Sequence, residues 1–147
     1  MPSAPVIRKL SREECDSILG RNHIGRIAFS YRDQVDIEPL SYVFVDGWIY
    51  GRTSLGSKLR VLAHNRWVAF ETDEIRGMFD WESVIVKGAL YRLDKKGTQS
   101  EAYAAALEIL RTHMPYALAA DDPMPNRTEV FRIHVDRVTG RAATPGD

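Results

Sequence analysis

Apolar and polar side chains alternate in short runs from residue 24 onward, which is the period of half-buried β-strands. Polar residues at 32–34 separate two of the runs, and Asp46-Gly47 between two others is a strong hairpin signal. Pro39 interrupts the second run. Because a proline has no N–H to donate, it predicts an edge, a bulge or a place where the ladder opens for another group. Six strands are predicted, over residues 24–31, 35–45, 48–53, 67–72, 83–93 and 129–138.

Helices are predicted where the alternation stops. Capping-box sequences, in which Ser or Thr is followed three residues later by Glu, start at Ser11 and Thr98. A further helix is expected after Lys58, and residues 73–80 are expected to form a polar loop. Strands with short connections and interspersed helices favour a small antiparallel β-barrel over a parallel α/β sheet. The predicted fold class is therefore mainly β, a six-stranded barrel with flanking helices.

The length of 147 residues predicts a single domain. We expect residues 1–10 to form an N-terminal arm, residues 11–140 the domain, and residues 141–147 a flexible tail. A barrel of this size often shares a large face with a second copy, so a homodimer is expected.

Composition and charge exclude several classes of protein. Hydrophobic residues make up 44% and charged residues 27%, which excludes wholesale disorder. Twenty basic residues balance twenty acidic ones, so a dominant basic field for nucleic acid is absent. The apolar runs are too short to cross a membrane, and no secretory signal opens the chain. The single cysteine, Cys15, cannot form an internal disulfide, which favours a cytoplasmic location.

The segment Ser54-Leu55-Gly56-Ser57-Lys58 joins a predicted strand to a predicted helix. A helix N-terminus offers unpaired N–H groups and a partial positive charge, and two serine hydroxyls and a lysine ammonium would add to it. These groups could form a cradle for an anion. The alternative is an ordinary strand-to-helix turn with a solvated lysine. The spacing is not that of a P-loop, and the chain has no Gly-rich dinucleotide fingerprint.

Other chemistry-bearing residues are scattered. The four histidines have no spacing typical of metal ligands and no cysteine partner, so no metal site is expected. The acidic residues near positions 71–74 and 80–82 are read as solvated. The sequence offers no nucleophile–base arrangement and identifies no catalytic residue.

Several motifs, in their order and spacing, resemble one known family. They are Gly25-Arg26-Ile27-Ala28, the strand 37–42, the hairpin 46–50, the segment 53–58, and Trp81-Glu82-Ser83-Val84. Together they resemble the pyridoxamine 5′-phosphate oxidase-related, FMN-binding split-barrel superfamily, and within it the branch that includes nitroimidazole-resistance proteins. The resemblance covers about residues 10–140. It implies a six-stranded antiparallel split β-barrel of the FMN-binding type.

The resemblance also implies where the cofactor FMN would bind. One strand would lie along the flavin ring and meet it with main-chain groups rather than pair with a neighbouring strand: Pro39, Leu40, Ser41 and Tyr42. A second group would surround the ribityl chain and phosphate: Arg52, Thr53, Ser54, Ser57 and Lys58. Trp81 and Ser83 would complete the site from the second subunit, so that a homodimer would hold two sites.

The function implied is that of an FMN-dependent oxidoreductase acting on a small organic substrate such as a nitro compound or a quinone. The flavin itself transfers electrons, so no catalytic triad is required. The electron donor would be NAD(P)H or a partner reductase. The chain lacks the Trp- and Arg-rich C-terminal segment of true pyridoxamine 5′-phosphate oxidases, so vitamin B6 oxidation is not expected. The alternatives are a deazaflavin-dependent reductase and a non-catalytic flavin- or haem-binding protein; His23 could lie near a flavin edge.

Overall fold

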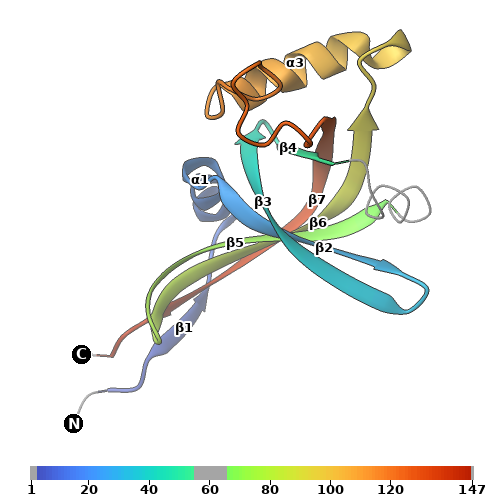
Figure 1. The fold of residues 1–147 in the computed structure, drawn as a ribbon. Coiled ribbons are helices and arrows are strands. Elements are labelled where there is room, and N and C mark those ends of the chain that lie inside the picture. Colours follow the sequence, from blue (N-terminus) through green and yellow to red (C-terminus); the bar gives the residue numbers. More distant parts are fainter. Residues whose placement is uncertain (1–2, 55–65, 147) are drawn as a thin grey trace.

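The computed structural model describes residues 3–54 and 66–146, and in them seven antiparallel strands form one sheet. The strands are β1 (Val6–Lys9), β2 (Ile24–Tyr31), β3 (Gln34–Val45), β4 (Trp48–Thr53), β5 (Trp67–Gly77), β6 (Asp80–Leu93) and β7 (Glu129–Thr144). Their order is β1-β7-β4-β3-β2-β5-β6, and β6 also pairs with β7. Strands β2 to β7 therefore close into a six-stranded barrel, and β1 extends the sheet beside β7 (Figure 1). The predicted fold class is confirmed.

Two tight hairpins set the register of the first three barrel strands. Arg32 and Asp33 connect β2 to β3, and Asp46 and Gly47 connect β3 to β4. All four residues have positive φ, between 50° and 81°. Two successive residues with positive φ are typical of the type I′ turn, whose twist matches that of paired strands.

Two helices flank the barrel in the described part of the chain. Helix α1 (Arg12–Arg21) begins at a capping box, as predicted: the Ser11 hydroxyl accepts from the Glu14 N–H, and the Glu14 carboxylate accepts from the Ser11 N–H. Helix α3 (Ser100–Arg111) follows a short 3₁₀ turn, η1 (Gly97–Gln99), so the predicted cap at Thr98 is wrong. The helix expected after Lys58 lies outside the described residues. Neither α1 nor α3 has the length and hydrophobicity that a membrane-spanning helix requires.

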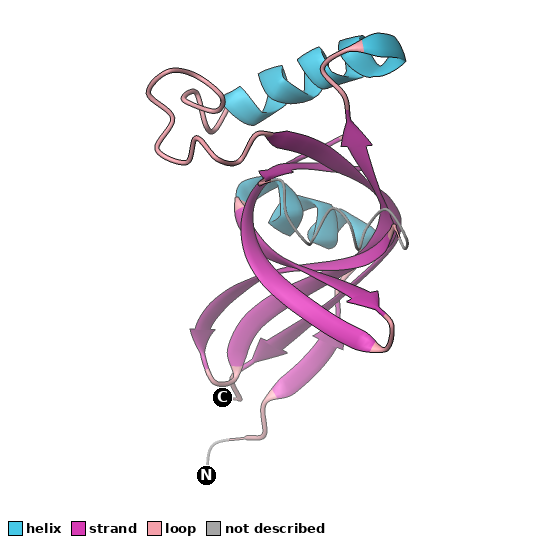
Figure 2. Cartoon of the chain, turned by 45° about the vertical axis from the view of Figure 1, so that its right-hand side comes forward, coloured by secondary structure: helices cyan, strands magenta, loops and turns pink. Residues whose placement is uncertain are grey.

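The helices divide the core into two clusters. Helix α1 packs with Leu19 and Cys15 against the barrel interior, where Tyr42, Phe70 and Ile133 are almost fully buried. Helix α3 buries Ala106 and Leu110 against the outer side of the barrel. Figure 2 shows α1 behind the ring of barrel strands and α3 above it.

The sheet extends further at one end than the sequence predicts. Residues 73–80 were expected to form a loop, but β5 continues to Gly77 and β6 begins at Asp80, so only Met78 and Phe79 form a turn. Strand β7 continues to Thr144. Strand β1 pairs with the end of β7, Val6 opposite Thr144, and β6 pairs with it from the other side. Part of the expected arm and part of the expected flexible tail therefore form paired strands. The sequence of either segment alone does not predict this pairing, because the partner lies at the other end of the chain.

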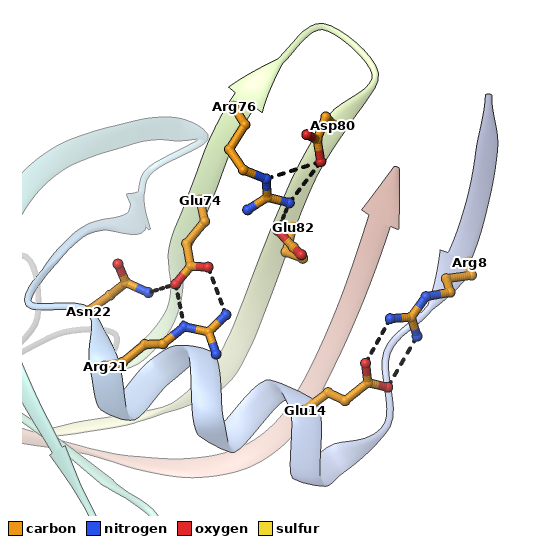
Figure 3. A network of polar contacts seen from close by, with 8 residues as sticks. All are labelled: Arg8, Glu14, Arg21, Asn22, Glu74, Arg76, Asp80 and Glu82. Carbon is orange, nitrogen blue, oxygen red and sulfur yellow. Dashed lines mark hydrogen bonds and ion pairs between the residues drawn. The ribbon is translucent and has the colours of Figure 1, made fainter. Parts of the chain in front are cut away.

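Ion pairs stabilise this extension and hold α1 to it (Figure 3). The Glu74 carboxylate on β5 accepts from the Arg21 guanidinium at 2.6 and 2.7 Å and from the Asn22 amide at 2.6 Å. Arg76 pairs with Asp80 and Glu82 across the β5–β6 hairpin. Because their charges are paired, the polar residues at the end of β5 and the start of β6 can lie side by side in the sheet.

Replacing Glu74 by glutamine is expected to lower the stability of the protein by about 1 kcal/mol at pH 7. The Arg21 guanidinium, aided by Asn22, lowers the pKa of Glu74 from its ordinary 4.5 to about 2. A carboxylate with a lowered pKa stabilises the fold above its ordinary pKa, and this contribution is lost as the pH falls toward 2. Urea unfolding of wild type and E74Q should therefore differ at pH 7 and converge at low pH. E108Q, on the exposed side of α3, is the matched control, and equal loss of stability in both variants would contradict the prediction.

Candidate functional site

A pocket opens between β3 and β4 and reaches the barrel interior. Its volume is about 90 Å³. Its inner lining is apolar, formed by Ile27, Phe29, Leu40, Leu90 and Phe131, whereas Arg52, Thr53, Ser54 and Arg127 make its polar part. The structure thus brings together five of the residues predicted for the cofactor site: Pro39, Leu40, Arg52, Thr53 and Ser54.

Strand β3 has an open edge beside this pocket. Strand β4 pairs with β3 only over Tyr42–Val45, so in the described part of the chain no strand pairs with β3 on the side facing away from β2 at Val35, Ile37, Pro39 and Ser41. The Tyr42 N–H donates to the His23 carbonyl at 3.0 Å. Because backbone groups alternate in direction along a strand, those of Ile37, Pro39 and Ser41 point away from β2, toward the open side.

Pro39 suits this open edge because it leaves no unpaired N–H there. It nevertheless lies opposite Arg26 of β2 in the sheet. The expectation that the main chain at Pro39 would have no neighbouring strand is therefore wrong on one side of the strand. On the other side the ladder is open, as the proline predicts.

Arg52 differs from the expectation of a cofactor contact. Its side chain is buried, and its guanidinium forms a two-pronged ion pair with the buried carboxylate of Asp122, Nη1 with Oδ2 and Nη2 with Oδ1 at 2.9 Å. The carboxylate also accepts from the backbone N–H groups of Leu118 and Met124, both at 2.9 Å. Arg52 therefore ties the loop before β7 to the end of β4.

Asp122 is a site residue that the sequence did not reveal. It lies 70 residues from Arg52, and no local pattern connects two residues so far apart. The Asp122 carboxylate accepts from the Met124 N–H two residues later, which forms an Asx-turn, and an Asp followed by Pro123 is one signal for such a turn. The Arg52 guanidinium and the two N–H donors hold the pKa of Asp122 well below its usual range.

Tyr42 and Ser41 lie beside the pocket without lining it. The Tyr42 side chain is fully buried, and its hydroxyl donates to the Leu19 carbonyl of α1 at 2.8 Å. Burial raises the pKa of this phenol to about 12. Its side chain therefore belongs to the core, while Ser41 contributes main chain to the open edge. The predicted residues Ser57 and Lys58 lie outside the described residues.

Trp81 and Ser83 lie at the other end of β6 from the pocket. Ser83 is seven residues from Leu90, which lines the pocket, so about 23 Å of strand separates them. The Ser83 hydroxyl donates to Glu71 at 2.9 Å, and the Trp81 indole N–H donates to the Met78 carbonyl at 3.2 Å. Within one chain, neither residue reaches the pocket.

Glu71 lies on the outer face of the sheet, within a cluster of polar side chains formed with Arg26, Asp73 and Ser83. It pairs with Arg26 at 3.1 Å and accepts from Ser83, and Asp73 lies beside it. Burial raises the pKa of Glu71, and the neighbouring Asp73 adds to this increase. This cluster is close to Pro39 in the sheet, because Arg26 on β2 lies opposite Pro39 on β3 and opposite Glu71 on β5.

The three histidines that the structure describes, His23, His113 and His134, do not line the pocket. His23 stacks on His113 with ring centres 3.5 Å apart, and its Nδ1 contacts the Tyr42 carbonyl at 3.2 Å. His23 is not among the residues that line the pocket, so its predicted place near a flavin edge has no support from the lining. Within the described ranges, no group of three or more His, Cys, Asp or Glu side chains could hold a metal ion.

Solved structures of similar fold include flavin proteins. An FAD-binding protein from Mesorhizobium loti is 27% identical, with a TM-score of 0.78, over 95% of this chain and 99% of that one. An FAD-binding protein from Mycobacterium smegmatis is 26% identical, with a TM-score of 0.66, over 92% and 98%. A candidate 5-nitroimidazole antibiotic resistance protein from Bacteroides thetaiotaomicron shares the fold at 15% identity, with a TM-score of 0.74, over 99% and 92%.

A family model also matches almost the whole chain. It is described as pyridoxamine 5′-phosphate oxidase and covers residues 11–142. The match includes the capping box that starts α1, strands β2 to β6, and β7 as far as residue 142. The resemblance inferred from the motifs is confirmed, and the chain belongs to the pyridoxamine 5′-phosphate oxidase family, with its split-barrel fold.

Proposed function

We propose that this protein is a flavin-dependent oxidoreductase that holds the flavin mononucleotide portion, common to FMN and FAD, at the pocket between β3 and β4. The observation that carries the proposal is one arrangement: an apolar pocket with a cationic mouth beside an open strand edge. Two structures named FAD-binding, at 26 and 27% identity, support it.

The described residues fit each part of a flavin. Apolar side chains such as Leu40 and Phe131 suit the face of an aromatic ring. The outward backbone groups of Ile37, Pro39 and Ser41 can bond to the polar edge of the ring, as an added strand would. Thr53, Ser54 and Arg127 offer hydroxyl and guanidinium donors to a phosphate.

When bound, the flavin supplies the electron transfer, and the chain orients it and excludes water. The substrate proposed is a small nitro compound or quinone, reduced with electrons from NAD(P)H or a partner reductase. The buried, unpaired Cys15 agrees with a reducing compartment such as the cytoplasm.

The pocket is too small to enclose a flavin in one chain. Small-molecule sites have volumes of about 300–1,000 Å³, whereas this pocket has about 90 Å³. Beside it, the outer face of the barrel exposes Val35, Ile37 and Trp67 to 75%, 66% and 62%. An exposed apolar face of this kind marks an interaction surface. We propose that a second copy covers it and brings its Trp81 and Ser83 to the flavin.

Replacing Ile37 by aspartate is expected to convert the dimer to a monomer and to weaken flavin binding at least tenfold. The buried charge would oppose association, and the site would lose its second half. Light scattering after size-exclusion chromatography measures the mass, and fluorescence quenching measures the flavin affinity. S17D, which adds the same charge on the exposed side of α1, is the control. A monomeric wild type, or an I37D dimer with unchanged affinity, would contradict the shared site.

The decisive experiment is a visible absorption spectrum of the purified protein, followed by mass identification of any molecule released on denaturation. Flavin bands that bleach on anaerobic reduction, with FMN or FAD released, would support the proposal. Reoxidation of the bound flavin by a nitro compound or quinone would support the oxidoreductase role. A colourless protein that binds neither FMN nor FAD would overturn it, and titration with a deazaflavin or haem would then test the alternatives.

A further inference from the structure

Two guanidinium groups lie at the polar part of the pocket, and they differ in their hydrogen-bond and ion-pair partners. One belongs to Arg52 at the end of β4, and the other to Arg127 in the loop before β7. An anion at this mouth could be recognised by either side chain. The interactions that each guanidinium already makes show which of the two is available to bind an anion.

The Arg52 guanidinium is already occupied. Both of its terminal nitrogens bond to the Asp122 carboxylate, and Nη1 also lies 3.4 Å from the carbonyls of Met124 and Arg127. The positive charge of Arg52 is matched by a buried negative charge. Moving it to a ligand would leave Asp122 buried and unpaired, which is costly.

The Arg127 guanidinium is available. Its side chain lines the pocket, and among the described residues it has no hydrogen bond or ion pair. Its backbone is held at two points: the N–H donates to the Met124 carbonyl at 3.1 Å, and the carbonyl accepts from Arg52. The base of the side chain is therefore fixed, while its charged end is free to meet a ligand.

The neighbours of Arg127 in the pocket favour an anion. Thr53 and Ser54 offer hydroxyl groups, and apart from the ion-paired Arg52 the rest of the lining is apolar. A guanidinium presents paired N–H donors that match phosphate oxygens, and such charge-assisted bonds are about twice as strong as neutral ones.

We infer that Arg127 is the residue that binds the phosphate group of the flavin, and that Arg52, which the family resemblance places there, instead holds the loop of Arg127 through Asp122. This inference rests on the proposed flavin site. It specifies that phosphate recognition comes from the loop before β7 rather than from the end of β4.

The test compares FMN with riboflavin, which has the same ring but no phosphate, on wild type and R127Q. Isothermal titration or fluorescence quenching gives both dissociation constants. The variant should bind FMN about 10- to 100-fold more weakly and riboflavin within about twofold of wild type. R127K should recover part of the loss. R12Q, which removes the same charge from the exposed side of α1, should leave both constants unchanged.

Two other outcomes of this titration would contradict the inference. Equal weakening of FMN and riboflavin, or no weakening of either, would overturn the assignment of Arg127 while the flavin site stands. A wild type that binds neither flavin would overturn the proposed function and this inference together. Because Arg127 has no side-chain partner among the described residues, the unfolding temperature of R127Q should match that of wild type, which excludes misfolding as the cause.

Discussion

Replacing Asp122 by alanine is expected to lower the unfolding temperature of the protein by about 10 °C. The substitution leaves the Arg52 guanidinium buried without its counter-ion, and it removes the acceptor of the Leu118 and Met124 N–H groups. Removing one partner of a buried pair is costly because the remaining charge is no longer compensated. The loop before β7 should lose its attachment to β4.

Calorimetry of wild type, D122A and D121A measures this effect. Asp121 is the adjacent residue and is exposed, so D121A should unfold close to wild type. The double variant R52M/D122L should be more stable than D122A, because it removes both charges and fills the space with apolar groups. An unfolding temperature for D122A equal to that of D121A would show that the ion pair does not hold the loop.

The pH dependence of stability provides a second measurement of the same pair. Arg52 holds the pKa of Asp122 below its usual range, so the folded state releases this proton more readily than the unfolded chain. The stabilising contribution is complete above the ordinary aspartate pKa of about 3.9 and is lost as the pH falls below it. Wild type should therefore lose stability more steeply than D122A in acid.

The barrel strands were predictable because their signal is local. The alternation of side chains and the positive-φ turn at Asp46-Gly47 are both encoded within a few residues. The extension of the sheet was not predictable in this way. Its polar residues form strands because Glu74 meets Arg21, 53 residues away in the sequence, and because β1 pairs with the opposite end of the chain.

The candidate site was predictable to a similar extent. The family motifs located Pro39, Leu40, Thr53 and Ser54, and the structure places all four on the pocket. The motifs could not show that Arg52 is neutralised, because its partner lies in a loop without regular structure. Arg127 has no distinguishing sequence context, and only its position on the pocket wall separates it from the other arginines.

Replacing Gly88 by alanine is expected to destabilise the protein by about 3 kcal/mol. Gly88 lies where β6 closes the barrel against β7, at a shift in the register between the two strands. A Cβ atom at this position would lie 1.8 Å from the His134 carbonyl oxygen. Because this contact is with backbone, no side-chain rotation can relieve it, and the two strands must move apart.

The closure of the barrel also shapes the pocket, because two residues of the closing strands line it. Leu90 on β6 is two residues from Gly88, and Phe131 on β7 is three residues from His134. G88A should therefore weaken flavin binding as well as stability. G20A is the control: an added Cβ at Gly20 meets nothing within 4 Å, and alanine in a helix is favoured by about 0.5–1 kcal/mol. Urea unfolding and flavin titration of both variants measure the two effects. If G88A bound flavin like wild type despite its lower stability, the pocket would not depend on the β6–β7 closure, and the site would have to lie wholly on the β3–β4 side.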